Sequence, residues 1–247
     1  MIKEVAKEIK RTNFCIALTG AGISTESGIP DFRSKNGLWS RYDINEYGYL
    51  DSFLRNPKKV WKMLLDMIIN FRDAKPNPAH VALAELEKMG YLKAVITKNI
   101  YDLHRKAGNK NVIEFHGNFS KLYCMDCKTI YNINDILTKI ELENLPPKCK
   151  CGGIIKPDII FFGEAIPRDA LIRSFDLANK CDLMLVIGTS CVVYPAAELP
   201  IIAKGKGAKI IEINKEESMI SHIADYKLIG KAGEILPKIL EEVKNLP

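Results

Sequence analysis

The stretch FCIALTGAGIS, residues 14 to 24, joins an apolar run directly to a glycine-rich turn. Such a run is typical of a strand that is buried on both faces of a parallel sheet. Gly20 and Gly22 permit a tight turn and a close approach of the backbone, so that free N–H groups can hold a pyrophosphate. The stretch departs from the dehydrogenase fingerprint, because Thr25 stands where the third glycine belongs. It indicates an α/β fold with a ligand-binding loop after the first strand.

Six further apolar runs alternate with helical patterns along the chain. They lie at residues 92–99, 111–117, 158–163, 183–190, 209–214 and 225–230. Helices are expected at NPAHVALAELEKMG, with Pro78 near its start and Gly90 as its stop, and at GEILPKILEEVKNL near the C-terminus. This alternation predicts an α/β fold with a Rossmann-like, doubly wound parallel sheet.

Two segments interrupt the alternation. Residues 34–75 contain the apolar helix VWKMLLDMIINF, and we expect a helical insertion with a lid loop there. Residues 120–155 hold four cysteines and a Pro-Pro-Lys turn, which indicates a small zinc-binding module. The Rossmann-like domain then comprises residues 1–33, 76–119 and 156–247.

Composition and charge narrow the class of protein. The length of 247 residues suits one large α/β domain with a small insertion. The net charge of +6 comes from scattered Lys and Arg without a basic block, so no direct binding of nucleic acid is expected. No apolar run reaches the roughly 18 residues of a membrane span. The N-terminus lacks the apolar stretch of a signal peptide, which favours the reducing cytoplasm.

The cysteines fall into two close pairs and three single residues. Cys124 and Cys127 form C-x-x-C, and Cys149 and Cys151 form C-x-C. Two such pairs can converge on one tetrahedral ion, and four thiolates make a closed, structural zinc site. A redox C-x-x-C or unliganded thiols are the alternative. The single cysteines lie in or beside apolar strands and are expected in the core: Cys15, Cys181 and Cys191.

Residues at the carboxyl ends of strands mark the cleft of an open α/β sheet. Asn99, His116 and the run Gly188-Thr189-Ser190 follow predicted strands in this way. A lone histidine at a strand end is a core residue as often as a functional one, so both interpretations of His116 are open at this point. The remaining histidines are expected to be structural or carry no supporting context: His80, His104 and His222.

Seven motifs occur in the order and spacing of the sirtuin family. They are GAGIS, GIPDFR, the N-I-x-x-L-H-x-x-A-G run, FHG, the paired cysteines, FFGE, and GTS followed by VYPAA. The chain resembles a sirtuin over essentially its whole length. The resemblance implies NAD as co-substrate, one structural zinc ion, and an acyl-lysine protein or peptide bound between the large domain and the small module. It further implies a deacylation that yields nicotinamide, O-acyl-ADP-ribose and free lysine.

The resemblance also implies roles for single residues. His116 matches the general base, which takes a proton from the attacking hydroxyl through the ribose. Asn99 matches a catalytic position in the nicotinamide-ribose pocket. The residues implied to bind the co-substrate are Gly20, Ala21, Gly22, Phe32, Arg33, Lys98, Asn99, Ile100, Tyr101, Gly188, Thr189, Ser190, Asn214, Lys215 and Ala232.

The substrate side follows from the same resemblance. An extended peptide pairs with a strand edge by β-augmentation, so the backbone supplies affinity and sequence selectivity is loose. Leu64 and Met67 stand where family members that accept acidic acyl groups carry a Tyr and an Arg, so we expect a preference for uncharged acyl groups. The implied walls of the peptide groove are Phe162, Gly163, Glu164 and Val193.

The nicotinamide pocket departs from the family pattern, since sirtuins read Gln-Asn-Ile-Asp where this chain reads Lys98-Asn99-Ile100-Tyr101. Lys98 puts a positive charge near a cationic leaving group and a developing cation. At about 6 Å and an effective dielectric near 20, the repulsion is on the order of 3 kcal/mol, about a hundredfold in rate. A turn of Lys98 toward the NAD phosphates would soften this loss. Tyr101 removes a hydrogen-bond acceptor, and we expect its ring to fill the pocket. Three functions therefore stay open: a weakened deacylase, a catalytically impaired NAD or ADP-ribose binding protein, and an NAD glycohydrolase or ADP-ribosyl transferase.

Overall fold

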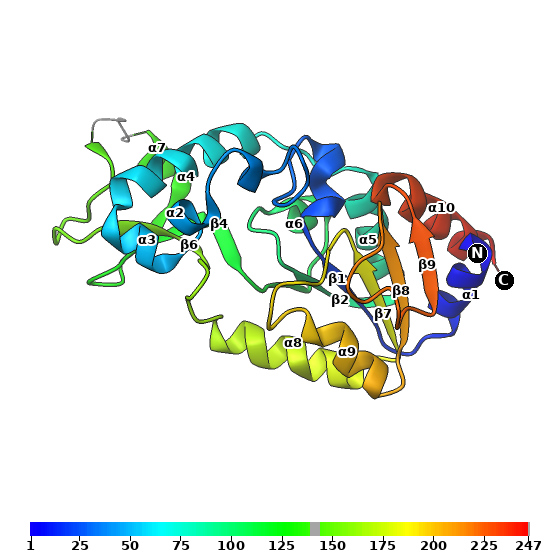
Figure 1. Cartoon of the computed structure of the whole chain (residues 1–247). Coiled ribbons are helices and arrows are strands. Elements are labelled where there is room, and N and C mark those ends of the chain that lie inside the picture. Colours follow the sequence, from blue (N-terminus) through cyan, green and yellow to red (C-terminus); the bar gives the residue numbers. More distant parts are fainter. Residues whose placement is uncertain (139–143, 247) are drawn as a thin grey trace.

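The computed structural model describes residues 1–138 and 144–246 (Figure 1). A six-stranded sheet has the order β3-β2-β1-β7-β8-β9, and all neighbouring strands are parallel. The predicted doubly wound sheet is confirmed. Its strands are β1 (Cys15–Thr19), β2 (Leu92–Thr97), β3 (Val112–Glu114), β7 (Leu183–Ile187), β8 (Lys209–Asn214) and β9 (Tyr226–Ile229).

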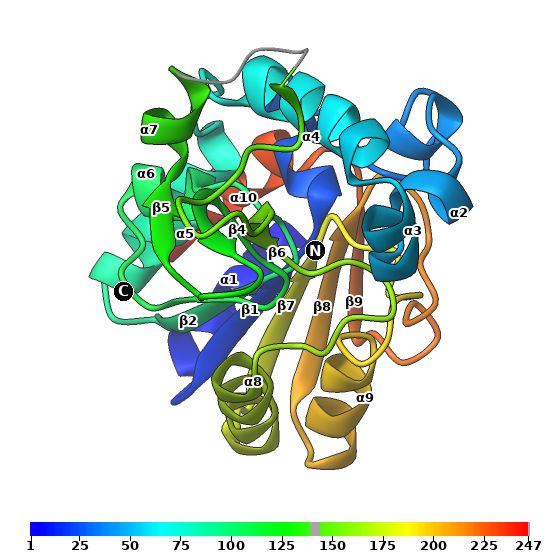
Figure 2. The same cartoon turned by 90° about the vertical axis from the view of Figure 1, so that its left-hand side faces the viewer.

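Helices cover both faces of this sheet, as Figures 1 and 2 show. One face packs on α1 (Ile2–Arg11), α5 (Pro78–Lys88) and α10 (Ala232–Asn245), and α10 contacts both of the other two helices. The other face packs on α8 (Arg168–Lys180) and α9 (Glu198–Gly205). Each face has its own apolar cluster, so the central strands are buried on both sides, as their continuous apolar runs indicated. Cys15, Cys181 and Cys191 are buried as expected.

The strand order reverses between β1 and β7. The chain builds β2 and β3 on one side of β1, and then crosses to build β7, β8 and β9 on the other. The loops that follow β1 and β7 therefore leave the sheet in opposite directions and open a crevice at its carboxyl edge. The glycine turn at residues 20–22 follows β1 at this edge, where η1 (Ala21–Ser27) begins.

A second apolar unit stands beyond this carboxyl edge. Its sheet has the order β5-β4-β6, and its core also includes the helix α4. The indole N–H of Trp61 on α4 donates to the carbonyl of Ile155 on β6 at 2.9 Å, so the two predicted insertions share one core. The elements of this region are η2 (Leu38–Ser40), α2 (Ile44–Tyr47), α3 (Leu50–Arg55), α4 (Pro57–Phe71), β4 (Gly117–Cys124), β5 (Ile130–Asn132), α7 (Ile133–Leu137) and β6 (Ile155–Ile159). The short helix α6 (Leu103–Ala107) follows β2 in the main domain. Among the described residues, no helix has the length and apolar character that crossing a membrane requires.

One predicted strand was wrong. The run at 158–163 was expected in the parallel sheet, but β6 pairs antiparallel with β4, where Ile159 lies opposite Gly117. The chain enters the cysteine-containing module along β4 and returns from it along β6, so the module sets the direction of this run. Beyond β6 the run continues to Phe162, which forms an isolated parallel bridge with Tyr49. Ile159 and Phe161 of this run belong to the second core instead of the first. The domain boundaries drawn from the sequence remain predictions.

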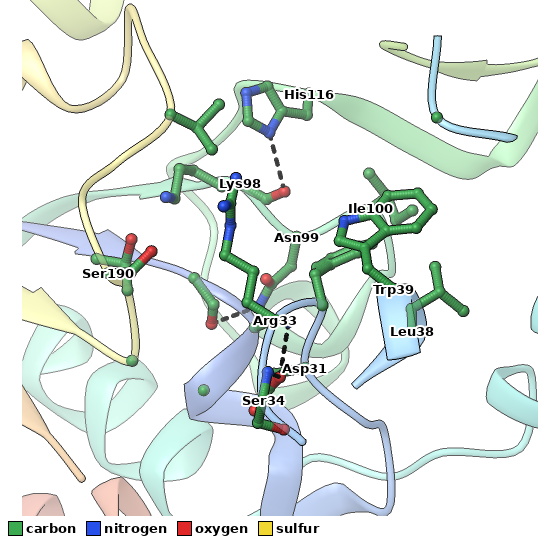
Figure 3. Close-up of a pocket in the computed structure, with 18 of the residues that line it drawn as sticks. Asp31, Arg33, Ser34, Leu38, Trp39, Lys98, Asn99, Ile100, His116 and Ser190 are labelled. Atoms are coloured by element: carbon green, nitrogen blue, oxygen red, sulfur yellow. Dashed lines mark hydrogen bonds between the residues drawn. The ribbon is translucent and has the colours of Figure 1, made fainter. Parts of the chain in front are cut away.

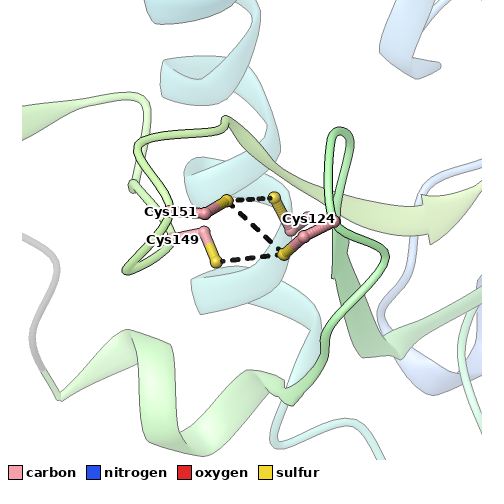
Figure 4. Close-up of side chains that lie close together, drawn as sticks. Cys124, Cys149 and Cys151 are labelled. Atoms are coloured by element: carbon pink, nitrogen blue, oxygen red, sulfur yellow. Dashed lines mark hydrogen bonds between the residues drawn. The ribbon is translucent and has the colours of Figure 1, made fainter.

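The four paired cysteines meet at one point (Figure 4). All four Sγ atoms lie within 4.8 Å of one another, with separations of 3.5 Å for Cys124–Cys151, 3.6 Å for Cys127–Cys149 and 3.4 Å for Cys127–Cys151. Zinc with Zn–S bonds of about 2.3 Å holds tetrahedral sulfurs about 3.8 Å apart. The donor set and its spacing therefore fit one structural zinc ion, as predicted.

We expect purified protein to contain one zinc ion per chain, and removal of the metal to lower Tm by about 10 °C or more, because four converging thiolates contribute folding free energy only when metal-bound. Elemental analysis and a thermal melt with and without a strong chelator measure both quantities. Cys181→Ala, which removes a buried core thiol instead, should keep the zinc content. Folded wild-type protein free of zinc would contradict the assignment.

Candidate active site

A cleft of about 610 Å³ opens between the carboxyl edge of the large sheet and the second apolar unit. Figure 3 shows its centre, where side chains from both units converge. The predicted peptide walls and acyl-pocket residues all line it: Leu64, Met67, Phe162, Gly163, Glu164 and Val193. The predicted co-substrate residues that line it are Gly20, Ala21, Gly22, Phe32, Arg33, Lys98, Asn99, Ile100, Gly188, Thr189, Ser190, Asn214, Lys215 and Ala232. Tyr101 is the only predicted binding residue that does not.

The glycine turn crosses the loop after β7 at very close range. The Gly22 N–H donates to the Gly188 carbonyl at 2.9 Å, and the Gly188 N–H donates to the Ile213 carbonyl at 3.0 Å. A Cβ at Gly20 would lie 2.7 Å from the Gly188 carbonyl oxygen, and one at Gly22 would lie 2.8 Å from the Gly188 Cα. Any side chain here would push the two loops apart, so these positions require glycine.

Asn99 fixes the loop after β2 against the glycine turn. Its Nδ2 donates to the Gly20 carbonyl at 3.1 Å, and its backbone N–H donates to the Thr97 hydroxyl. Asn99 is 2% exposed, yet its Oδ1 has no hydrogen-bond partner within the described residues. A buried acceptor without a partner at the bottom of a cleft marks a place where a ligand or water donates a hydrogen bond.

Sequence reasoning missed a contact between His80 and Ser24, which lies in η1. His80 Nε2 lies 3.2 Å from the Ser24 hydroxyl, and its Nδ1 accepts the Asn77 backbone N–H at 3.3 Å, as the capping box of α5. Burial lowers the pKa of His80 to about 4, so the ring is neutral at pH 7. The Asn77-Pro78 helix start was visible in the sequence, but nothing local showed that this end of α5 faces the glycine turn.

His104 lies beside His80 as part of the core, which agrees with the structural role expected for it. Its Nε2 is 2.9 Å from the Thr19 hydroxyl at the end of β1, and the two imidazole rings are 5.0 Å apart. Burial lowers the pKa of His104 to about 3, and the neighbouring His80 adds to this effect. Both rings thus act as neutral hydrogen-bonding groups that join α5 and α6 to the cleft floor.

His116 reaches the cleft directly after β3. Its Nδ1 is 3.3 Å from the Lys98 carbonyl oxygen, which requires the proton on Nδ1 and leaves Nε2 as an acceptor. Burial lowers the pKa of His116 to about 4, and the positive charge of Lys98 lowers it further, while the bond to the Lys98 carbonyl opposes both. At pH 7 the ring is neutral and able to take a proton.

Lys98 and Arg33 bring two cationic side chains into the same part of the cleft, as Figure 3 shows. Burial lowers the pKa of Lys98; the nearby Cys191 thiol opposes this, and Arg33 adds to it. Within residues 1–138 and 144–246, no carboxylate forms an ion pair with Lys98 or Arg33. This part of the cleft therefore suits an anionic group, such as a phosphate.

Tyr101 does not fill the pocket, contrary to expectation. Its ring packs edge-on against Phe71 of α4, with centroids 6.3 Å apart, in the second apolar core. The aromatic ring packs in this apolar cluster because burial against Phe71 stabilises it more than exposure to the polar cleft would. Its hydroxyl is buried near Ser24 without a hydrogen-bond partner among the described residues, and burial raises the pKa of Tyr101.

The far end of the cleft is apolar. Met63, Leu64 and Met67 come from one face of α4, and Ile159 and Phe161 approach from β6 and the segment after it. Met63, Leu64 and Met67 are each at most 3% exposed. This end suits an apolar or neutral group and offers no charge to a carboxylate.

Replacing Lys98 by Gln should raise the pKa of His116 by about one unit, because the variant removes the positive charge that disfavours the imidazolium form. Titration of the His116 ring by NMR measures this directly, and the chain has only four histidines to assign. Lys3→Gln, on the exposed side of α1, should leave the titration unchanged. An unchanged His116 pKa in the Lys98 variant would show that the two groups do not interact.

Comparison with known proteins agrees with this arrangement. The Sir2 family model matches residues 20–195. An NAD-dependent protein deacylase from Pyrococcus furiosus is 50% identical over 248 residues, which cover 100% of this chain and 99% of the relative. A Sir2 structure solved for the mechanism and regulation of these enzymes has a TM-score of 0.93 at 47% identity, covering 100% of this chain and 98% of that chain. A Sir2 structure with a deacetylated p53 peptide and 3′-O-acetyl ADP-ribose has a TM-score of 0.93 at 42% identity, covering 98% of both chains.

The family model spans the cleft from the glycine turn to the loop after β7, and the relatives match the chain along its whole length. The sheet order, the four-cysteine cluster and the cleft between two units are all accounted for by this one relationship. The chain therefore belongs to the Sir2 family, the sirtuins.

Proposed function

We propose that this chain is an NAD-dependent protein-lysine deacylase that yields nicotinamide, O-acyl-ADP-ribose and free lysine. The observation that carries the proposal is that one cleft is lined by the glycine turn, by a neutral His116 and by an apolar end. Close relatives named as NAD-dependent protein deacylases support it. Mass spectrometry of an acetyl-lysine peptide incubated with NAD and the purified chain tests it.

The residues divide the work along the cleft. The cleft beside the glycine turn and the loop after β7 would hold the diphosphate, where Arg33 and Lys98 supply positive charge. The Gly20 and Gly22 N–H groups, expected from the sequence to be free, already donate to the Ile187 and Gly188 carbonyls. The unpaired Oδ1 of Asn99 would accept a hydrogen bond from the bound co-substrate. When bound, NAD supplies a glycosidic bond whose cleavage releases nicotinamide and leaves its ribose to receive the acyl group. His116 Nε2 would then take the proton of the ribose hydroxyl, because Nδ1 is already committed to the Lys98 carbonyl.

The substrate lysine would enter from the side of the second unit. Its uncharged acyl stem fits the apolar end of the cleft, where water is excluded by Leu64 and Met67. The peptide backbone would pair with the segment at Phe162 to Glu164 and with Val193, which line the same cleft. A cytoplasmic location is part of this proposal, and it suits the free thiols of the core cysteines.

A second function is favoured by Lys98 specifically. A cation in this part of the cleft strengthens the binding of phosphate groups but opposes the positive charge that forms on the ribose as neutral nicotinamide leaves. A chain that binds NAD or ADP-ribose well and turns it over slowly would have this arrangement. We therefore propose that Lys98 and Tyr101 reduce catalysis more than they reduce binding of the nucleotide.

The double variant Lys98→Gln with Tyr101→Asp should raise deacetylation on the order of a hundredfold to a thousandfold, because one change removes a repulsive charge from the cleft and the other puts a carboxylate in the loop beside it. Steady-state kinetics with acetyl-lysine peptide measure this. Lys98→Gln alone should recover most of the gain, since Lys98 lines the cleft and Tyr101 does not.

Two controls separate catalysis from binding. His116→Ala in the double variant should abolish turnover while leaving the fold intact. The Kd for ADP-ribose, from calorimetry, should change by less than about tenfold between wild type and the double variant. Equal turnover by wild type and double variant would show that Lys98 and Tyr101 are tolerated.

The chain should deacylate acetyl-lysine peptide at least about tenfold faster than succinyl-lysine peptide at equal concentration. Burying a carboxylate at the apolar end of the cleft without a cation costs several kcal/mol. Competition between the two peptides in one reaction, read by mass spectrometry, gives the ratio. Met67→Arg should lower the ratio of acetyl to succinyl turnover by supplying a cation, whereas Met67→Leu should leave this ratio unchanged. Faster turnover of the succinyl peptide would contradict our description of this pocket.

A further inference from the structure

The segment from Ile160 to Glu164 forms one wall of the cleft and is fastened on two sides by its backbone. The Ile160 N–H donates to the His116 carbonyl at 3.0 Å, which ties the segment to the catalytic residue. The Phe162 N–H donates to the Gly48 carbonyl at 2.9 Å, and the Phe162 carbonyl accepts the Leu50 N–H at 3.0 Å. These bonds leave Gly163 and Glu164 to be held by other means.

Lys156 on β6 supplies a buried cation beneath this segment. Its side chain is fully buried, and its ammonium has three N–H donors. They reach the Ile159 carbonyl at 2.6 Å, the Pro157 carbonyl at 3.3 Å and the Glu164 carboxylate at 3.0 Å. The ammonium also lies 5.0 Å from the Phe161 ring centroid, at cation–π distance.

Glu164 completes the network from the other side. Its Oε2 accepts the Phe161 N–H at 3.0 Å, and its Oε1 accepts the Tyr123 hydroxyl at 3.3 Å. The Glu164 N–H donates to the Phe161 carbonyl at 3.0 Å, which closes a tight turn over residues 161–164. The side chain of Glu164 therefore points into the second unit, and only its backbone is left to meet a peptide.

We propose that Lys156 is a positioning residue for the acyl-lysine substrate: by pairing with Glu164, it holds the 161–164 turn at the distance at which its outer backbone edge can pair with a peptide. The inference rests on the proposed function. A fully satisfied buried ion pair fixes one arrangement of the groups around it, because every alternative leaves a charge buried without a partner.

The location of this pair separates it from the other ion pairs of the described residues. In each of the others both side chains are at least partly exposed, whereas the Lys156 side chain has 0% exposure. Exposed pairs contribute little to a fold and fix little geometry. The buried pair lies at the joint between the zinc-binding module, through Tyr123, and the cleft wall.

The test compares Lys156→Met and Glu164→Gln with Lys180→Met, which removes an exposed ion pair to Asp176 on α8. Glu164→Gln keeps the shape of the side chain and one acceptor oxygen, so it serves if the lysine variant fails to fold. For each variant, Kd is measured for acetyl-lysine peptide by fluorescence anisotropy and for ADP-ribose by calorimetry. Amide hydrogen exchange at Phe161 and Phe162 reports the turn itself.

The expected result is a weakening of peptide binding by about tenfold or more in Lys156→Met and Glu164→Gln, with ADP-ribose affinity within about twofold of wild type. Exchange at Phe161 should accelerate in both, and Lys180→Met should change nothing. Where turnover is measurable, KM for peptide should rise more than kcat falls.

Peptide affinity within twofold of wild type in a folded variant would overturn the inference. So would an equal loss of peptide and ADP-ribose affinity, because that marks general destabilisation. A wild-type chain that binds the peptide without turning it over would count against the proposed function alone. A wild-type chain that binds no acyl-lysine peptide would overturn both.

Discussion

The contact on which the active cleft depends is the backbone-to-backbone approach of the glycine turn to Gly188. At the point where the strand order reverses, the Gly22 N–H and the Gly188 carbonyl are hydrogen-bonded at 2.9 Å, with no room for a Cβ on Gly20 or Gly22. This approach brings the ends of β1 and β7 together and places the start of η1 at the cleft. Asn99 then attaches the end of β2 to the same turn through the Gly20 carbonyl. The ends of β1, β2 and β7 are thereby held together by contacts within the protein itself.

The second unit supplies the other wall of the cleft, which the doubly wound sheet alone does not have. This wall contains an apolar slot and a strand edge. Its core is continuous from α4 to β6, with Trp61 hydrogen-bonded across the two, so the helical and cysteine-containing insertions are packed into one unit. The unit is joined to the cleft floor where the Ile160 N–H meets the His116 carbonyl. The proposed general base and the proposed peptide-binding segment are thus one hydrogen bond apart. The four-cysteine cluster, at the outer end of the same small sheet, stabilises a unit too small to rely on its apolar core alone.

How much the sequence revealed depended on how local each signal was. Continuous apolar runs identified the parallel strands, and paired cysteines identified the metal cluster, because period and spacing are local properties. The run at 158–163 was misassigned because its composition suits either sheet, and only its pairing with β4 distinguishes them. The partnership of Ser24 with His80 joins residues 56 positions apart and has no local signature. The turn of Tyr101 toward Phe71 was missed for the same reason, since a family position was taken to fix the direction of a ring whose size and apolar character direct it elsewhere.

Lys98 and Tyr101 therefore act on the cleft by different physics, although they are neighbours in one motif. Lys98 acts through charge, since it lies in the cleft, has no carboxylate partner among the described residues and lowers the pKa of His116. Tyr101 acts through packing, since its ring adds to the second core. An unpaired buried polar atom, Asn99 Oδ1, lies in the same motif. Unpaired buried polar atoms that persist in a stable fold concentrate where a ligand completes the hydrogen bonding. The motif thus keeps an open, buried acceptor at Asn99, although Lys98 adds a positive charge to the same cleft.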